Sequence, residues 1–119
     1  MPAVRLAETQ AHQGARAFVY EFGWQPPTFD GQLGACHASE LPFVFDNLAD
    51  PAFIPLIGTD PPQELADALH SAWVAFATTG DPGWPTYLEH DRAVMMFDTD
   101  SSVAYDPRST VRRLWEGRR

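Results

Sequence analysis

Cysteine is nearly absent from this chain, which has 119 residues and one cysteine, Cys36. A single thiol excludes an intrachain disulfide framework and leaves the redox compartment open. No apolar run approaches the roughly 18 residues of a membrane-spanning helix, and no apolar stretch follows a basic start. We therefore expect no membrane partner, no signal peptide within the chain and, by default, a cytoplasmic location.

Positive charge is also scarce, because 16 acidic residues outnumber 8 basic ones and give a net charge of -8. Nucleic acids and anionic membrane surfaces repel such a chain, so we expect neither as a partner. The basic residues near the C-terminus allow two interpretations, a nucleic-acid-binding tail or cations at the negative end of a terminal helix. We favour the second interpretation. These residues are Arg112, Arg113, Arg118 and Arg119.

Apolar residues are plentiful, at 45% of the chain, and aromatic residues make up 13%. This composition excludes a disordered or low-complexity chain and requires a buried core. A chain of this length buries only about two thirds of its unfolded surface, which is little for four Trp and eight Phe. We therefore expect exposed apolar surface, and association, when the chain is alone.

The strongest helical periodicity lies over residues 61–79. Asp60 precedes Pro61, a pattern that predicts a helix capped by the Asp60 side chain, and Gly80 follows as a stop. We expect its buried face to contain Leu65, Leu69, Ala72, Trp73 and Phe76.

The clearest strand signal lies over residues 15–24, where aromatic residues alternate with smaller or polar ones. The order of helices and strands, without an internal repeat, predicts the edge of a layered α/β sheet. The other predicted elements are a helix over 2–14, a short helix over 40–48, a hairpin of strands 93–98 and 103–105, and a helix begun by Asp106-Pro107 with a buried stripe of Val111, Leu114 and Trp115.

His37 is the best candidate for chemistry among the four histidines. It lies in a glycine-bearing loop just after the predicted strand, where α/β folds place functional side chains. A general base needs a side chain that titrates near neutral pH, and histidine has one. We expect His12, His70 and His90 to be surface or structural residues.

Catalytic partners for His37 are missing from the sequence. No serine lies in the G-x-S-x-G turn that exposes a nucleophilic hydroxyl. Cys36 adjoins His37, but neighbouring side chains on an extended chain point apart, so we interpret Cys36 as a small core thiol. We interpret Glu40 as a helix-start or loop-fixing group rather than the acid of a triad.

Metal and cofactor sites are not indicated either. The histidines show no H-x-x-x-H spacing, and one cysteine cannot form a structural zinc site. The sequence also has no glycine-rich phosphate-binding loop. We therefore expect no metal and no cofactor.

The segment around His37 resembles the histidine block of the type-B carboxylesterases, the family of bacterial para-nitrobenzyl esterases and cholinesterases. The resemblance covers about Leu6 to Trp115, in the order of that family's C-terminal part. It departs from the family at Ser39, where a larger apolar residue is commoner, and in a short linker over 81–84. The matching segments are Gly34-Ala35-Cys36-His37-Ala38-Ser39-Glu40-Leu41-Pro42-Phe43-Val44-Phe45-Asp46-Asn47-Leu48, Ala72-Trp73-Val74-Ala75-Phe76-Ala77, Thr79-Gly80-Asp81-Pro82, Trp84-Pro85, Tyr87, Met96-Phe97-Asp98 and Asp106-Pro107-Arg108.

This resemblance implies an α/β chain that forms the C-terminal part of an α/β-hydrolase fold. The implied parts are the last sheet strands, the histidine loop, a long packing helix, and the terminal hairpin and helix. Residues 1–119 would then form a single partial domain of a carboxylesterase.

The resemblance also implies that His37 is the catalytic histidine of a Ser, acid, His triad in a serine carboxylesterase that hydrolyses carboxylic esters. The nucleophile and the acid would lie upstream, so an ester substrate and an upstream N-terminal esterase segment are the expected partners. The chain alone would be inactive. The alternative is a non-catalytic truncated product or a cholinesterase-like binding module.

Overall fold

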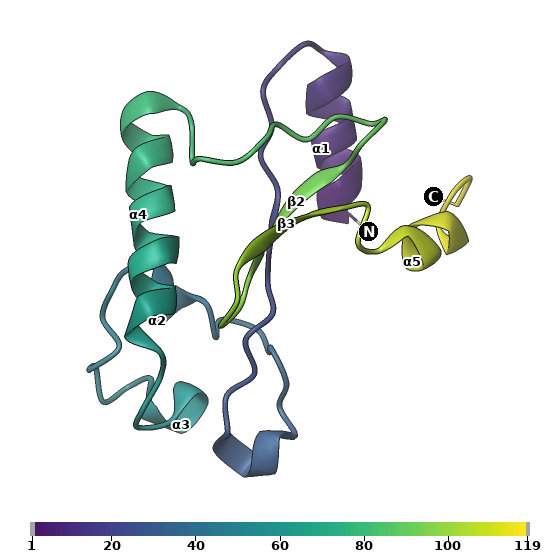
Figure 1. Ribbon diagram of the computed structural model, residues 1–119. Helices are drawn as coiled ribbons and strands as arrows, with labels where there is room; N and C mark the ends of the chain where they lie inside the picture. Colours follow the sequence, from purple (N-terminus) through teal and green to yellow (C-terminus); the bar gives the residue numbers. More distant parts are fainter. Residues whose placement is uncertain (1, 119) are drawn as a thin grey trace. The chain divides into compact units, whose positions relative to one another are not determined.

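The computed structural model describes residues 2–118. Its three strands form one sheet in the order β1-β2-β3. All four predicted helices and the predicted hairpin are present, with somewhat different ends (Figure 1). In chain order the elements are α1 (Pro2–His12), β1 (Tyr20–Phe22), η1 (Thr28–Gly31), α2 (Leu41–Val44), α3 (Ile54–Ile57), α4 (Gln63–Thr79), β2 (Ala93–Phe97), β3 (Ser102–Tyr105) and α5 (Ser109–Leu114).

Strand β1 is regular over three residues only, although the sequence predicts a strand over 15–24. The Met95 amide donates to the Val19 carbonyl at 3.0 Å, so pairing begins before the regular strand. Further upstream, the Ala17 carbonyl accepts from the amide of Tyr87, which lies in no strand. The pairing of backbone hydrogen bonds is therefore irregular before Tyr20, because Ala17 faces the linker between α4 and β2 and not a strand.

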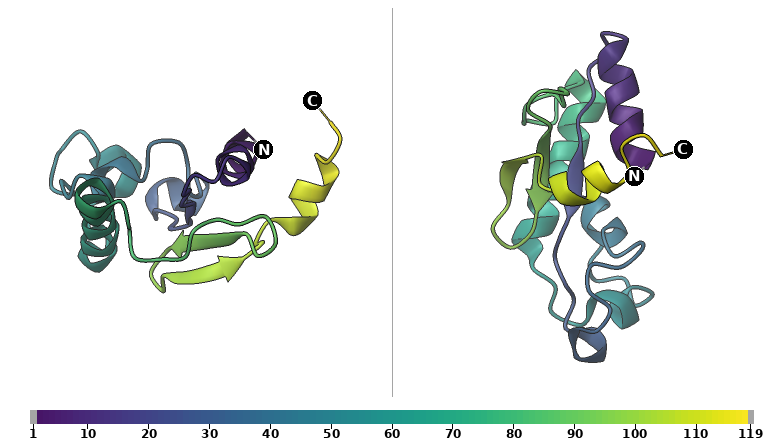
Figure 2. Two further views of the ribbon diagram at one scale, coloured as in Figure 1. Left: turned by 90° about the horizontal axis from the view of Figure 1, so that it is seen from above. Right: turned by 90° about the vertical axis from the view of Figure 1, so that its right-hand side faces the viewer.

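The described residues pack as two compact units. The first comprises the described part of residues 1–21, 84–95 and 102–119, and the second comprises residues 22–83 and 96–101. In the second unit α2 packs on α4, as both views in Figure 2 show. Each unit has its own buried apolar residues. In the first they are Ala7, Trp84, Tyr87, Ala93 and Val94, and in the second they are Phe43, Val44, Ile57, Leu65, Ala66, Leu69, Ala72 and Phe97.

Helix α4 begins later than predicted, and its first turn is not capped by Asp60. The N-cap residue is Pro62, which makes no side-chain cap hydrogen bond. Pro61 is kept out of the helix because it precedes a proline, and the ring of that proline disfavours the helical region for the residue before it. At the other end the prediction is confirmed, since Gly80 has a φ of 75° and donates its amide to the Phe76 carbonyl.

The apolar surface of α4 is wider than the face that the rest of its unit covers. Leu65, Leu69 and Ala72 are buried, as predicted. Trp73 and Phe76 are instead 46% and 48% exposed, so the prediction is wrong for these two side chains. The reason is that α2 has four residues and covers one side of a helix that is apolar on more than one side.

Helix α5 also departs from its predicted packing, because Val111, Leu114 and Trp115 are all exposed. The helix has six residues, fewer than two turns, and a polar side chain holds it to its unit. That side chain is Arg112, which binds both carboxylate oxygens of Asp106 at 3.0 and 2.7 Å.

Low pH should loosen the packing of α5 on its unit, because protonation of Asp106 breaks its ion pair with Arg112. The hydrogen bonds from Arg112 lower the pKa of Asp106 below its ordinary value of 3.8. A carboxylate with a depressed folded-state pKa stabilises the fold above its unfolded pKa, and this contribution is lost as pH falls through the folded pKa. We expect the amide NMR shifts of α5 to move toward unfolded values as the pH falls below about 4. Asp106→Asn should show those shifts already at neutral pH, and an unchanged acid profile in this variant would contradict the assignment.

Candidate functional site

His37 lies in a tight turn between η1 and α2. The Ser39 amide donates to the Cys36 carbonyl at 3.2 Å, so His37 and Ala38 are the two central residues of the turn. Ala38 has a φ of 67°, at the position that carries a positive φ in type II turns. Glycine and asparagine are usual there, so an alanine is strained. The His37 side chain is exposed.

The Ser39 side chain fastens this turn from inside the protein. Ser39 is 0% exposed, and its hydroxyl donates to the Cys36 carbonyl at 2.7 Å. The same carbonyl oxygen thus accepts two hydrogen bonds from one residue. On the other side of the turn, the Leu41 amide donates to the Ala38 carbonyl at 3.2 Å.

Helix α2 anchors the loop to the core of its unit. Glu40 is the N-cap residue, as its predicted helix-start role requires, although its side chain makes no cap hydrogen bond. Phe43, one turn later, is fully buried. Its ring contacts those of Phe22 and Trp24, with centroids 5.2 and 5.1 Å apart. The His37 turn is therefore continuous with an aromatic cluster that fixes its C-terminal side.

The other three histidines have the surface or structural positions that the sequence predicts. His70 lies on α4 with its Nδ1 atom 2.8 Å from the Val44 carbonyl, at the C-terminal end of α2. His12 is exposed beside Glu89, with 3.2 Å between His12 Nε2 and the carboxylate. His90 is exposed as well. Each has a position that needs no catalytic explanation.

Over residues 2–118, the His37 ring has no hydrogen bond and no ion pair. Its neighbour Cys36 is a half-buried free thiol. Two carboxylates close to it in sequence are engaged elsewhere. Asp46 accepts from the side-chain amide of Gln63 at 2.8 Å, and Asp50 accepts from a backbone amide two residues later. The structure thus places the predicted base without bringing an acid or a nucleophile to it.

The described part of the chain has neither a metal-binding cluster nor a helix that could span a membrane. Among residues 2–118, no three His, Cys, Asp or Glu side chains gather closely enough to hold a metal ion. None of the helices in that range combines the length and the apolar character needed to cross a bilayer.

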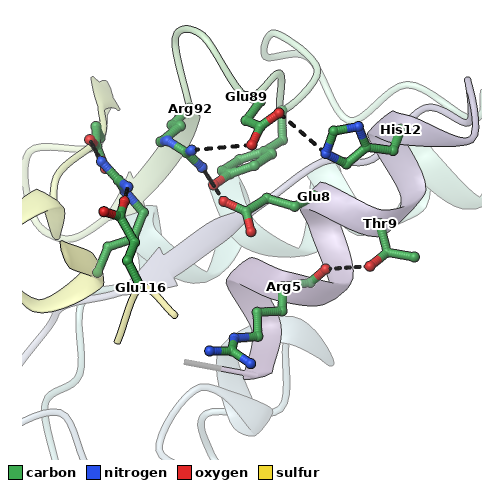
Figure 3. A network of polar contacts seen from close by, with 10 residues as sticks. Arg5, Glu8, Thr9, His12, Glu89, Arg92 and Glu116 are labelled. Carbon is green, nitrogen blue, oxygen red and sulfur yellow. Dashed lines mark hydrogen bonds and ion pairs between the residues drawn. The ribbon is translucent and has the colours of Figure 1, made fainter. Parts of the chain in front are cut away.

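A polar cluster that the sequence did not predict lies in the first unit (Figure 3). Arg92 forms an ion pair with Glu8 of α1 and donates to the Tyr87 hydroxyl at 2.9 Å. Burial lowers the pKa of Arg92, but the bonds to Tyr87 and Glu8 outweigh it, and the pKa is raised. Glu89 extends the cluster, because its carboxylate lies 3.9 Å from Arg92 and 3.2 Å from His12.

A cavity of about 640 Å³ adjoins this cluster. Four arginines and three glutamates are among its lining residues. Arg5 donates to the backbone carbonyls of Trp115 and Arg118, and Arg112 is paired with Asp106 and Glu116. Each of the three glutamates is thus paired with a basic side chain, which indicates a structural network along this part of the cavity.

Comparison with known proteins gives a consistent family. The model of the Carboxylesterase family matches residues 1–115. The "Para-nitrobenzyl esterase" of Bacillus subtilis (strain 168) is 37% identical over 120 residues, which cover 94% of this chain and 24% of that protein. The "Phenmedipham hydrolase" of Pseudarthrobacter oxydans is 38% identical over 98 residues, which cover 74% of this chain and 20% of that protein.

Solved structures show the same similarity. A carboxylesterase of Geobacillus stearothermophilus superposes with a TM-score of 0.79 at 38% identity, over 94% of this chain and 24% of the other. A thermophilic PNB esterase gives a TM-score of 0.82 at 33% identity, with the same shares covered. The chain thus spans about a quarter of the length of these relatives.

Proposed function

Because this chain belongs to the carboxylesterase family, we propose that it supplies the catalytic histidine of a serine carboxylesterase and that His37 is this residue. The observation that carries the proposal is the His37 turn. It presents an exposed imidazole, without a partner among residues 2–118, on a strained backbone that buried contacts hold in place. Strain that the surrounding structure maintains is a feature of functional sites.

The fold supports the same reaction class. The chain has the fold of the corresponding part of an α/β-hydrolase carboxylesterase, of which it covers about a quarter. We propose that residues 1–119 form part of a single carboxylesterase domain, whose other residues come from an upstream segment. That segment would carry the nucleophilic serine and the acid, since no serine of this chain lies in a G-x-S-x-G turn.

The proposed reaction is two-step hydrolysis of a carboxylic ester. His37 accepts the proton of the upstream serine hydroxyl as the serine oxygen attacks the acyl carbon, and then gives the proton to the leaving alcohol. In the second step His37 accepts a proton from water as the water oxygen attacks the acyl group, and it returns the proton to the serine as the carboxylic acid leaves. The acidic residue of the triad, also on the upstream segment, accepts a hydrogen bond from the other ring nitrogen of His37 and so fixes the tautomer of the imidazole.

Exposed apolar side chains support an upstream partner. Trp73, Val74 and Phe76 lie on α4 and are each nearly half exposed, and Phe29 and Phe45 are 66% and 68% exposed. Apolar surface of this extent is typical of an interface or of a core that another segment completes. The occupant that we propose for the exposed side of α4 is the upstream esterase segment.

We expect the exposed side of α4 to make the isolated chain associate. The double variant Trp73→Ser, Phe76→Ser should raise the dissociation constant of self-association about tenfold or more, because each aromatic ring contributes on the order of 1–2 kcal/mol of apolar burial. Sedimentation equilibrium measures the change. Ala68→Ser, an exposed position five residues before Trp73 and therefore on another side of the same helix, is the control and should have no effect. Unchanged association in the double variant would exclude this surface.

An assembled esterase tests the proposed function. We define it as the Bacillus subtilis para-nitrobenzyl esterase in which the matching quarter is replaced by this chain. It should hydrolyse a simple aryl ester, whereas the isolated 119-residue chain should not. Hydrolysis by the isolated chain that is lost in His37→Ala would refute the upstream nucleophile. A folded assembled esterase without activity would favour the alternative, a non-catalytic module.

A further inference from the structure

The Ser39 hydroxyl is an unusual group for its place in the fold. In the described part of the chain, Ser39 is the only polar or charged residue that is buried. A buried hydroxyl costs free energy unless it is hydrogen-bonded, and an alanine there would pack without that requirement. The hydroxyl has one hydrogen bond, to the Cys36 carbonyl at 2.7 Å. The buried hydroxyl therefore stabilises the backbone of the turn through this hydrogen bond.

The turn needs such a contact because of Ala38. An alanine at a φ of 67° is less stable than a glycine and is held by the contacts on either side of it. The backbone bond that closes the turn, from the Ser39 amide, is 3.2 Å long, whereas the hydroxyl bond to the same oxygen is 2.7 Å. The shorter of the two bonds is thus the one that depends on the side chain.

We propose that Ser39 is a positioning residue for His37: its buried hydroxyl holds the strained turn that carries the imidazole. The proposal rests on the proposed function of His37. A base must align with both a nucleophile and an acid, and an error of about 1 Å can cost about a hundredfold in rate. Ser39 itself does not touch substrate, since its hydroxyl is inside the protein and donates to a carbonyl.

Ser39→Ala in the assembled esterase tests this role. We expect kcat to fall about ten- to hundredfold with KM changed by less than about twofold, because the loss affects alignment and not substrate binding. The double variant Ser39→Ala, Ala38→Gly should recover part of the loss, since glycine adopts the positive φ without strain. Ser71→Ala, an exposed serine on α4, is the control and should be neutral. An unchanged kcat in Ser39→Ala, or a loss that glycine does not relieve, would overturn the proposal.

The isolated chain gives a second test that does not depend on the esterase. Hydrogen exchange of the Ser39 and Leu41 amides should become about tenfold faster in Ser39→Ala, because the turn loses one hydrogen bond worth roughly this factor. The amides of α4 should keep their rates. Equal acceleration in α4 would show a general loss of stability and would also overturn the positioning role. Failure of the proposed function appears separately, as activity that survives His37→Ala.

Discussion

His37→Ala is expected to lower the kcat of the assembled esterase by about 10⁴- to 10⁶-fold, because removal of the base leaves only the binding and oxyanion contributions of a serine hydrolase. Both chemical steps should fail, so no burst of alcohol release should precede the slow rate. KM should change little, since the imidazole is proposed to move protons and not to bind the ester.

The control for this variant is His90→Ala. His90 is also a solvent-exposed histidine, and it lies in the other unit of the chain. Its loss should leave kcat within about twofold of the parent, as for ordinary surface substitutions. Stopped-flow hydrolysis of an aryl ester measures both the burst and the steady rate. A loss of less than about tenfold in His37→Ala would remove His37 from the catalytic role.

Local sequence patterns correctly predicted the features that depend only on residues close together in the chain. Gly80 ends α4 with the positive φ that glycine permits, and the periodicity of Leu65 and Leu69 placed their buried face correctly. Asp60 failed as a cap because a second local rule, the effect of Pro62 on Pro61, acts at the same place. A capping pattern therefore has to be considered together with the prolines that follow it.

The errors in burial have a different cause. Hydrophobic periodicity indicates which side of a helix can be buried, but not whether the chain contains something to cover it. Trp73 on α4 and Leu114 on α5 illustrate this, since they are 46% and 62% exposed. The ion pair between Arg92 and Glu8 was also invisible in the sequence, because 84 positions separate its members and neither is in a motif.

The candidate site was predicted in part. The resemblance pointed to His37, and the structure adds how its loop is held. The left-handed conformation of Ala38 has no sequence signal, since alanine is not a residue that favours a positive φ. Ser39 did carry a signal, as the polar departure from an apolar family position. Its meaning became clear only with its burial and its bond to Cys36.

Phe43→Ala is expected to have the largest effect on stability, with a loss of about 3–5 kcal/mol in the unfolding free energy of the second unit. Phe43 is completely buried, and its removal leaves a cavity between the rings of Phe22 and Trp24. Hydrogen exchange of the α4 amides in the isolated chain measures the loss, because α2 packs on α4.

Phe45→Ala is the matched control for this variant. Phe45 is the C-cap residue of α2, the helix that contains Phe43, and it is 68% exposed. Its truncation should therefore cost less than about 1 kcal/mol. Equal losses in the two variants would contradict the assignment of Phe43 to the core.

The comparison of Phe43→Ala with Ser39→Ala is also informative. Phe43→Ala should accelerate exchange in both α4 and the His37 turn, because the Phe43 amide binds the Glu40 carbonyl next to that turn. Ser39→Ala should accelerate exchange in the turn alone, so the pair of variants separates the support of the loop from its fine positioning.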